Sequence, residues 1–88
     1  MLSKEQKEKI IAQYRTHASD TGSPQVQISI LTAEIADLSG HLTEHKKDYS
    51  SRKGLLRKVS ERRRLLKYLE REDAKAYSTL AEKLKLKQ

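Results

Sequence analysis

Basic and aromatic side chains recur along one side of a helix expected over residues 50–71, and their spacing suits contacts with nucleic acid. At about 100° per residue, four residues share the side opposite the apolar ones: Arg57, Arg64, Tyr68 and Arg71. Guanidinium groups bind phosphates through paired hydrogen bonds, and a phenol ring stacks on bases or hydrogen-bonds to nucleotides. The stretch therefore predicts a nucleic-acid-binding face.

The net charge of +7 is concentrated in the middle of the chain. Residues 43–71 carry eleven basic and four acidic side chains, whereas residues 1–42 carry four basic and five acidic ones. A uniformly basic surface would suggest solubility or loose binding to polyanions, but a concentrated one suggests a docking face. The distribution therefore favours nucleic-acid binding over the alternative, a solvated helix face in a basic protein.

His41 and His45 stand four residues apart in the sequence HLTEH, with Asp48 three residues further on. The pattern superficially resembles the zinc-protease helix, but its glutamate is beside the second histidine, and no cysteine or nearby third histidine supports the pair. The alternative is a solvated helix end with both imidazoles free. The three glycines are isolated, and no nucleophile with a base and an orienting group can be nominated. We therefore expect no metal, no cofactor and no enzymatic activity.

Membranes and DNA are the other possible partners of a basic helix. The chain lacks Trp and Phe, no apolar run approaches the roughly 20 residues that span a bilayer, and the N-terminus is unlike a secretory signal. We therefore expect a cytoplasmic protein without membrane contact. The polar loops DTGS and HKKDYSS favour RNA, because short polar side chains suit a shallow minor groove that displays 2′-hydroxyls. A basic helical DNA-associated protein is the alternative.

Four helices are expected to position these residues, in a single all-α domain over residues 1–88. Three are expected to be long and packed antiparallel through short loops, after a short N-terminal helix. Ser3 and Gln6 match the capping-box pattern at the start of that first helix. Ser23 and Pro24 match an N-cap followed by proline at the first helical position of the second helix.

The core is expected between the apolar sides of the second and third helices. The apolar residues of the second helix recur three and four positions apart, as far as the expected end of the helix: Ile28, Leu31, Ile35, Leu38 and Leu42. The apolar residues of the third helix share one side: Leu55, Val59, Leu66 and Leu69. A turn around residues 45–48 separates the two helices, with Asp48, Ser50 or Ser51 as candidate N-caps. Asp73 is expected to cap the last helix.

Four stretches of the chain resemble the family of bacterial small-subunit ribosomal protein fifteen: DTGSPQVQISILT, GHLTEHKKD, SRKGLLRKVSERRRLLKYLERED and YSTLAEKL. The resemblance runs nearly from end to end. It implies a four-helix protein that binds the central domain of small-subunit ribosomal RNA early in assembly. Members recognise a three-way RNA junction and, separately, an irregular minor groove in one of its arms. In the ribosome they work among other small-subunit proteins and touch large-subunit RNA, and some repress their own messenger RNA.

Carried over by position, the resemblance implies two sets of RNA contacts. The junction contacts would come from the start of the second helix and from the third: Thr21, Gly22, Gln27, Arg64, Tyr68 and Arg71. The contacts with the arm would come from the turn between these helices: His41, Asp48 and Ser51. Tyr49 and Ser50 stand where the family usually has histidines. Lys85 stands where it often has glycine, so the last helix is expected to run on there.

Overall fold

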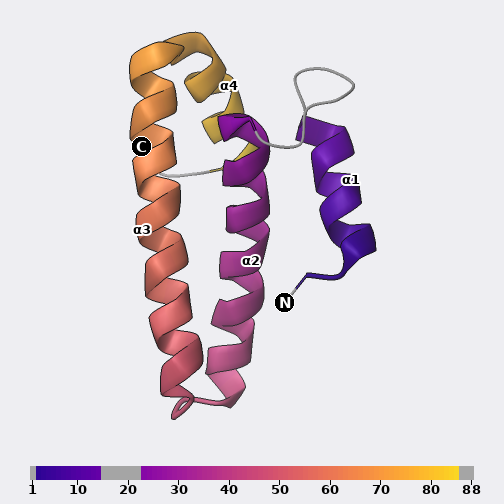
Figure 1. The fold of residues 1–88 in the computed structure, drawn as a ribbon, viewed down its shortest axis with the longest axis vertical. Helices are drawn as coiled ribbons and strands as arrows, with labels where there is room; N and C mark the ends of the chain where they lie inside the picture. Colours follow the sequence, from indigo (N-terminus) through magenta and orange to yellow (C-terminus); the bar gives the residue numbers. More distant parts are fainter. Residues whose placement is uncertain (1, 15–22, 86–88) are drawn as a thin grey trace.

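Four α-helices make up the described part of the computed structural model, residues 2–14 and 23–85 (Figure 1). Their bounds are Lys4–Tyr14 (α1), Pro24–Glu44 (α2), Tyr49–Glu72 (α3) and Ala74–Leu84 (α4). The all-α class with four helices is confirmed, and these residues form no strand. Two helices are long rather than the three expected, with 21 and 24 residues in α2 and α3, whereas α4 has 11 residues, as many as α1.

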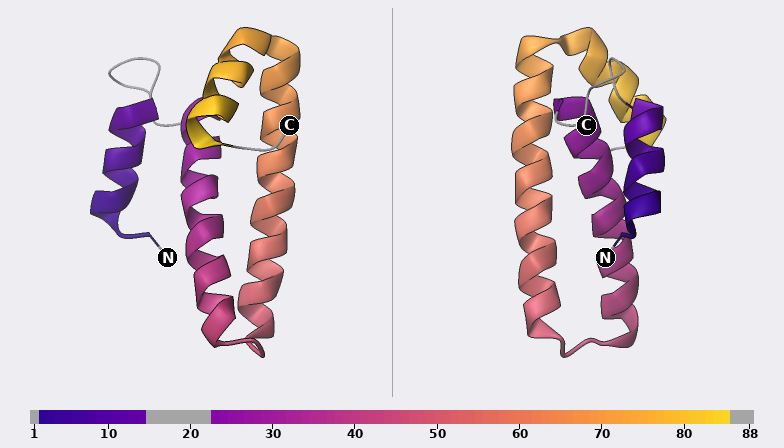
Figure 2. Two further views of the ribbon diagram at one scale, coloured as in Figure 1. Left: turned by 180° about the vertical axis from the view of Figure 1, so that it is seen from behind. Right: turned by 45° about the vertical axis from the view of Figure 1, so that its right-hand side comes forward.

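The two long helices form an antiparallel hairpin that spans the length of the molecule (Figure 1). The chain reverses again after α3, so that α4 folds back across the end of the hairpin where α2 begins (Figure 2). A buried cluster joins the three helices there through Ile28 of α2, Leu69 of α3 and Leu80 of α4. Toward the turn the expected apolar side of α2 is less buried, since Leu38 and Leu42 are only half-buried. The best-packed end of the hairpin is therefore the one farthest from the turn.

Hydrogen bonds near the ends of the helices explain where these begin. The Ser3 N–H donates to Gln6 Oε1 at 2.9 Å, and the Gln6 N–H donates to Ser3 Oγ at 3.2 Å, which completes the capping box. Ser23 caps α2 just ahead of Pro24, and Asp73 caps α4 through its carboxylate. Three N-termini expected from the sequence are thus confirmed, because each cap acts within a few residues of its own helix.

Lys85 ends α4, contrary to the expectation that the helix runs on at this position. It adopts the left-handed conformation, with φ 55° and ψ 41°, and its N–H donates to the carbonyl oxygens of Ala81 and Glu82. This is a common way for helices to stop, and it favours glycine because a Cβ crowds the following carbonyl. The left-handed conformation is less favourable for lysine than it would be for glycine, but the hydrogen bonds of the last turn still form.

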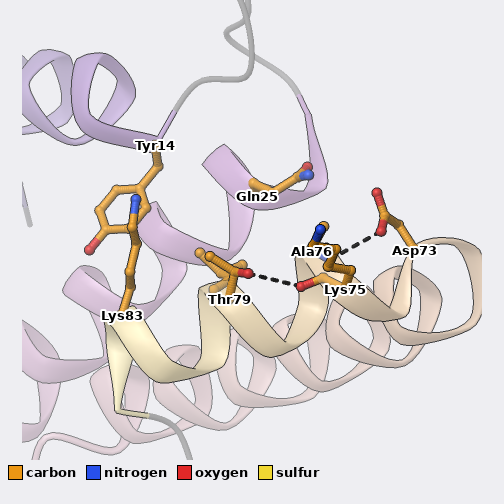
Figure 3. A pocket seen from close by; sticks show the side chains of 8 residues that line it. Tyr14, Gln25, Asp73, Lys75, Ala76, Thr79 and Lys83 are labelled. Carbon is orange, nitrogen blue, oxygen red and sulfur yellow. Dashed lines mark hydrogen bonds between the residues drawn. The ribbon is translucent and has the colours of Figure 1, made fainter.

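The short helix α1 lies along α2 and away from α3 (Figure 2). No residue of α1 is fully buried. Tyr14 at its end packs against the buried cluster, and Lys83 Nζ of α4 lies 5.7 Å from the centre of the Tyr14 ring (Figure 3). A hollow of about 310 Å³ opens beside this ring, between α4 and Gln25 of α2 (Figure 3). Tyr14 is therefore a side chain of α1 that reaches the buried cluster.

An ion pair with a buried carboxylate links the two long helices. Glu34 of α2 is only 5% exposed, and its Oε1 lies 3.3 Å from Lys58 Nζ of α3. One turn further along α3, Arg62 donates to Thr32 Oγ1 at 3.4 Å. A buried carboxylate is costly without a partner, so sliding one helix past the other would be unfavourable. We infer that the pair holds α2 and α3 in register, a role that apolar periodicity does not reveal.

Candidate nucleic-acid interface

The turn between α2 and α3 brings three predicted contact residues together, and we call His41, Asp48 and Ser51 the turn cluster. Asp48 is the N-cap of α3, and its Oδ1 accepts a hydrogen bond from the Ser51 N–H at 3.1 Å. Its Oδ2 accepts from the Ser51 hydroxyl at 2.7 Å and contacts His41 Nε2 at 2.9 Å. The cluster is accessible, with 41% of the His41 side chain and 35% of the Asp48 side chain exposed.

Hydrogen bonds stabilise the ionised form of Asp48. The bond from His41 has the largest effect, followed by those from the Ser51 hydroxyl and backbone, and together they lower the pKa of the Asp48 carboxyl to about 2. The carboxylate is therefore ionised at neutral pH and only accepts hydrogen bonds, so His41 Nε2 must carry the hydrogen that it donates.

The two histidines are not the free imidazoles of a solvated helix end. His41 is bonded to Asp48, and the His45 ring stacks on the His41 ring with centres 4.6 Å apart. Within residues 2–14 and 23–85, no three His, Cys, Asp or Glu side chains are grouped so as to hold a metal ion. The contacts at the turn instead orient the imidazole of His41 toward the carboxylate.

The turn cluster uses its donors internally and retains acceptors. The Ser51 hydroxyl and His41 Nε2 both donate to Asp48, so neither is left to donate to a partner. The hydrogen-bond acceptors that remain are one lone pair on Asp48 Oδ1, the Ser51 hydroxyl oxygen and, in the neutral imidazole, His41 Nδ1. Such a surface suits a partner that donates hydrogen bonds. In the minor groove of a nucleic acid, the donors are the guanine exocyclic amine and, in RNA, the 2′-hydroxyl.

The basic side chains predicted on the outer side of α3 are exposed, and we call Arg57, Arg64, Tyr68 and Arg71 the stripe. Tyr68 is 46% exposed although it is a large aromatic residue, and the Arg71 guanidinium lies 5.6 Å from the centre of its ring. Arg71 Nε also lies 3.4 Å from Glu72 Oε1. The predicted separation of the faces of α3 is therefore confirmed, because Leu69 is buried on the other side.

Gln27 lies at the same end of the hairpin as Tyr68 and Arg71. It is exposed on α2 next to Ile28, which packs with Leu69 of α3. The other two residues expected to contact the junction, Thr21 and Gly22, lie outside the described residues. The structure therefore brings Gln27 and the far end of the stripe to one end of the hairpin and the turn cluster to the other.

The separation between these two groups is set by α3. From Ser51 to the stretch between Arg64 and Arg71, a helix rises about 20 to 30 Å at 1.5 Å per residue. Both groups are carried by one packed hairpin, with the pair of Glu34 and Lys58 between its helices. Their spacing can therefore be matched only by a partner with two contact points at a corresponding distance.

Tyr49 and Arg52 form a further exposed pair at the turn that the spacing argument did not single out. Tyr49 is 64% exposed, and the Arg52 guanidinium lies 6.0 Å from the centre of its ring. The signal in the sequence was an aromatic residue followed three positions later by an arginine, directly after Asp48. This pair lies beside the turn cluster, at the end opposite Tyr68.

A stripe of arginines along one face of a helix is the electrostatic footprint expected of a small nucleic-acid-binding protein. None of the helices in the described ranges is long and apolar enough to cross a membrane.

The family model for ribosomal protein S15 matches residues 7–87, and the chain belongs to this family. The resemblance stated from the sequence is thereby confirmed.

Three relatives illustrate the similarity, each a small ribosomal subunit protein uS15. That of Lysinibacillus sphaericus is 55% identical over 86 residues, which cover 98% of this chain and 97% of the relative. That of Staphylococcus saprophyticus is 54% identical over 83 residues, 94% of this chain and 93% of the relative. That of Alkalilimnicola ehrlichii is 55% identical over 86 residues, 98% and 97% of the two chains. The similarity therefore extends over nearly the whole of each protein.

Proposed function

We propose that this chain is a structural, RNA-binding component of the small ribosomal subunit, without a catalytic role. It binds a three-way junction and an adjacent arm in the central domain of small-subunit ribosomal RNA and so aids assembly. Other small-subunit proteins, large-subunit RNA across the subunit interface and its own messenger RNA are its further partners. Family membership supports the ribosomal role, and the two polar groups at opposite ends of one hairpin support the two-point contact with RNA.

The observation that carries this proposal is the ionised carboxylate of Asp48 within a basic stretch. Phosphates repel a carboxylate, so Asp48 favours binding only if the RNA donates a hydrogen bond to it. A guanine amine or a 2′-hydroxyl in a shallow minor groove is such a donor. His41 and Ser51 hold the carboxylate in place before the RNA arrives, which lowers the entropy cost of forming the contact.

The far end of the stripe, from Arg64 to Arg71, supplies the second contact, at the junction. Arg64 and Arg71 bind phosphates, whose negative charge is dense where several RNA strands converge. Tyr68 stacks on a base or hydrogen-bonds to a nucleotide, and the guanidinium of Arg71 above its ring orders it. Gln27 contributes an amide from α2 at the same end of the hairpin.

The RNA class is tested by comparing ligands at one moderate salt concentration, with magnesium present. We expect a folded three-way junction to bind much more tightly than its isolated arms, because only the junction engages both groups at their fixed spacing. Equal affinity for an unbranched RNA duplex of the same length would refute the proposal. Preference for duplex DNA would support the alternative of a DNA-associated protein.

The role of Asp48 is tested by Asp48→Asn, with Asp73→Asn as the matched control. Both aspartates are N-caps, asparagine caps equally well, and each change removes one negative charge. We expect Asp48→Asn to weaken junction binding by about 5- to 30-fold, as for a lost charge-assisted hydrogen bond. Asp73→Asn should leave binding unchanged or slightly tighter. Equal or tighter binding by Asp48→Asn would reject the contact.

A second ligand separates recognition from charge. If the contacted base pairs of the arm are changed to a regular helix, the difference between Asp48→Asn and the wild-type protein should vanish. Persistence of the same difference on the regular arm would show that the carboxylate acts without reading the minor groove.

A further inference from the structure

The first turns of α3 expose a large aromatic ring next to the turn cluster. Tyr49 is 64% exposed, more than any other large hydrophobic residue in the described part of the chain. Arg52 lies one turn further on, with its guanidinium 6.0 Å from the centre of the ring. The Arg52 Nη2 atom donates to the carbonyl oxygen of Lys46 at 2.7 Å, which ties the guanidinium to the turn. The ring is thus backed on one side by an anchored cation.

The surroundings of Tyr49 are strongly basic. Residues 46–53 contain four cations and a single carboxylate, that of Asp48, which is engaged with His41 and Ser51. A polyanion is therefore the complementary partner. A polyanion that also carries flat aromatic groups can stack on an exposed aromatic ring and so bind more tightly. RNA is such a polyanion, because its bases can stack on the ring.

We propose that Tyr49, backed by Arg52, is a stacking platform for one unpaired nucleobase of the RNA arm held at the turn cluster. The inference rests on the RNA-binding function proposed above and adds a third contact to it. Tyr49 directly follows Asp48 in the chain, so the base belongs to a nucleotide close to the contacted minor groove. The unpaired base stacks on the side of the ring that Arg52 leaves open, while Arg52 and Lys53 face the phosphates.

A protein segment is a poorer fit to the same surface. Leu56 is 63% exposed two turns further along this side of α3, so apolar groups are present. The side chains between the tyrosine and the leucine, however, are Arg52 and Lys53, and no continuous apolar strip joins the two. A single flat ring flanked by cations matches one nucleotide better than a peptide, which needs several adjoining apolar contacts.

The test uses the full-length chain and arm RNAs that carry a single unpaired adenine at successive positions from the contacted base pairs. We expect one position at which Tyr49→Ala binds about 5- to 30-fold more weakly than the wild-type protein, whereas Tyr49→Phe retains the affinity. On the fully paired arm the three proteins should bind alike. Because Tyr49 is exposed, circular dichroism should show that all variants keep their helices.

Fluorescence gives an independent readout, since the chain contains no tryptophan. Tyr49→Trp should be strongly quenched by the same RNA that distinguishes Tyr49→Ala, because a stacked base quenches indole emission. Leu56→Trp, at a site of similar exposure on the same side of the helix, is the matched control and should retain its emission. Equal quenching at both positions would overturn the platform at Tyr49.

Three further outcomes separate this inference from the proposed function. If Asp48→Asn weakens binding to the arm but Tyr49→Ala changes affinity for none of the adenine positions, the stacking platform is rejected and the RNA-binding function stands. If Tyr49→Ala weakens binding equally on the fully paired arm, the ring contacts the groove itself and the platform is also rejected. If Asp48→Asn has no effect on any RNA, the RNA contact proposed for the turn cluster is rejected, and the stacking platform that rests on it is rejected as well.

Discussion

Replacing Lys58 by methionine would remove the partner of the buried carboxylate of Glu34. The Glu34 side chain is 7% exposed, the Lys58 side chain is 21% exposed, and their charged atoms lie 3.3 Å apart. At an effective dielectric constant of about 20, the gross attraction is about 5 kcal/mol before desolvation is counted. Loss of one partner from a fully buried pair costs about 3 to 5 kcal/mol. Because Lys58 retains some exposure, we expect Lys58→Met to lower the free energy of unfolding by about 2 to 3 kcal/mol.

For a chain of 88 residues this loss corresponds to a fall in Tm of about 10 to 15 °C. The measurement is thermal and urea unfolding followed by far-UV circular dichroism. Lys67→Met is the matched control, because it removes an exposed lysine from the same helix and should change stability by no more than about 0.5 kcal/mol. The double variant Glu34→Leu/Lys58→Met should recover most of the stability, since a well-packed apolar pair often replaces a buried ion pair without loss.

Two results would refute this reasoning. If Lys58→Met unfolds within about 0.5 kcal/mol of the wild-type protein, water solvates Glu34 and the pair does not hold the helices together. If the double variant is stable and still prefers the three-way junction as strongly, apolar packing alone sets the register of α2 and α3. A stable double variant that loses this preference would show that the pair sets the spacing of the two RNA contacts.

Three further perturbations test the stripe, the end of α4 and the pH dependence of the turn. Arg64→Ala and Arg71→Ala should each weaken RNA binding and lower the salt slope by a little under one, whereas Tyr68→Ala should weaken binding with less change in slope. Unfolding of any of them in circular dichroism would contradict the assignment of the faces of α3. Lys85→Gly should stabilise the protein by about 1 kcal/mol in thermal unfolding, because glycine adopts the left-handed stop without a Cβ clash, and a loss of stability would contradict this explanation. The lowered pKa of Asp48 means that its contribution to stability is present above its ordinary pKa of 3.8 and is lost as the pH falls through about 2. Measured as the difference in Tm from Asp48→Ala, this contribution should shrink between pH 5 and pH 2, and a constant difference would argue against it.

The sequence by itself determined the features that depend on neighbours within about one helical turn. Ser23 and Asp73 cap their helices because each side-chain oxygen reaches a backbone N–H three residues ahead. For α3 the sequence left Asp48, Ser50 and Ser51 as alternative caps, and the structure shows that Asp48 is the one used. The separation of Tyr68 from Leu66 onto opposite sides of α3 follows from the helical period alone, because two residues along a helix correspond to a turn of about 200°. The RNA contacts assigned through the family resemblance remain predictions, since neither periodicity nor capping identifies a ligand.

Only the tertiary structure decided which polar groups meet across the hairpin. Glu34 stands one residue before Ile35, which belongs to the apolar side of α2, and only the packing of α3 against α2 buries Glu34 and places Lys58 beside it. His41 and Asp48 lie seven residues apart on either side of a turn, so the path of that turn determines whether the imidazole reaches the carboxylate. Such contacts depend on how two helices are placed in space, whereas the period of a single helix specifies only which residues share a face.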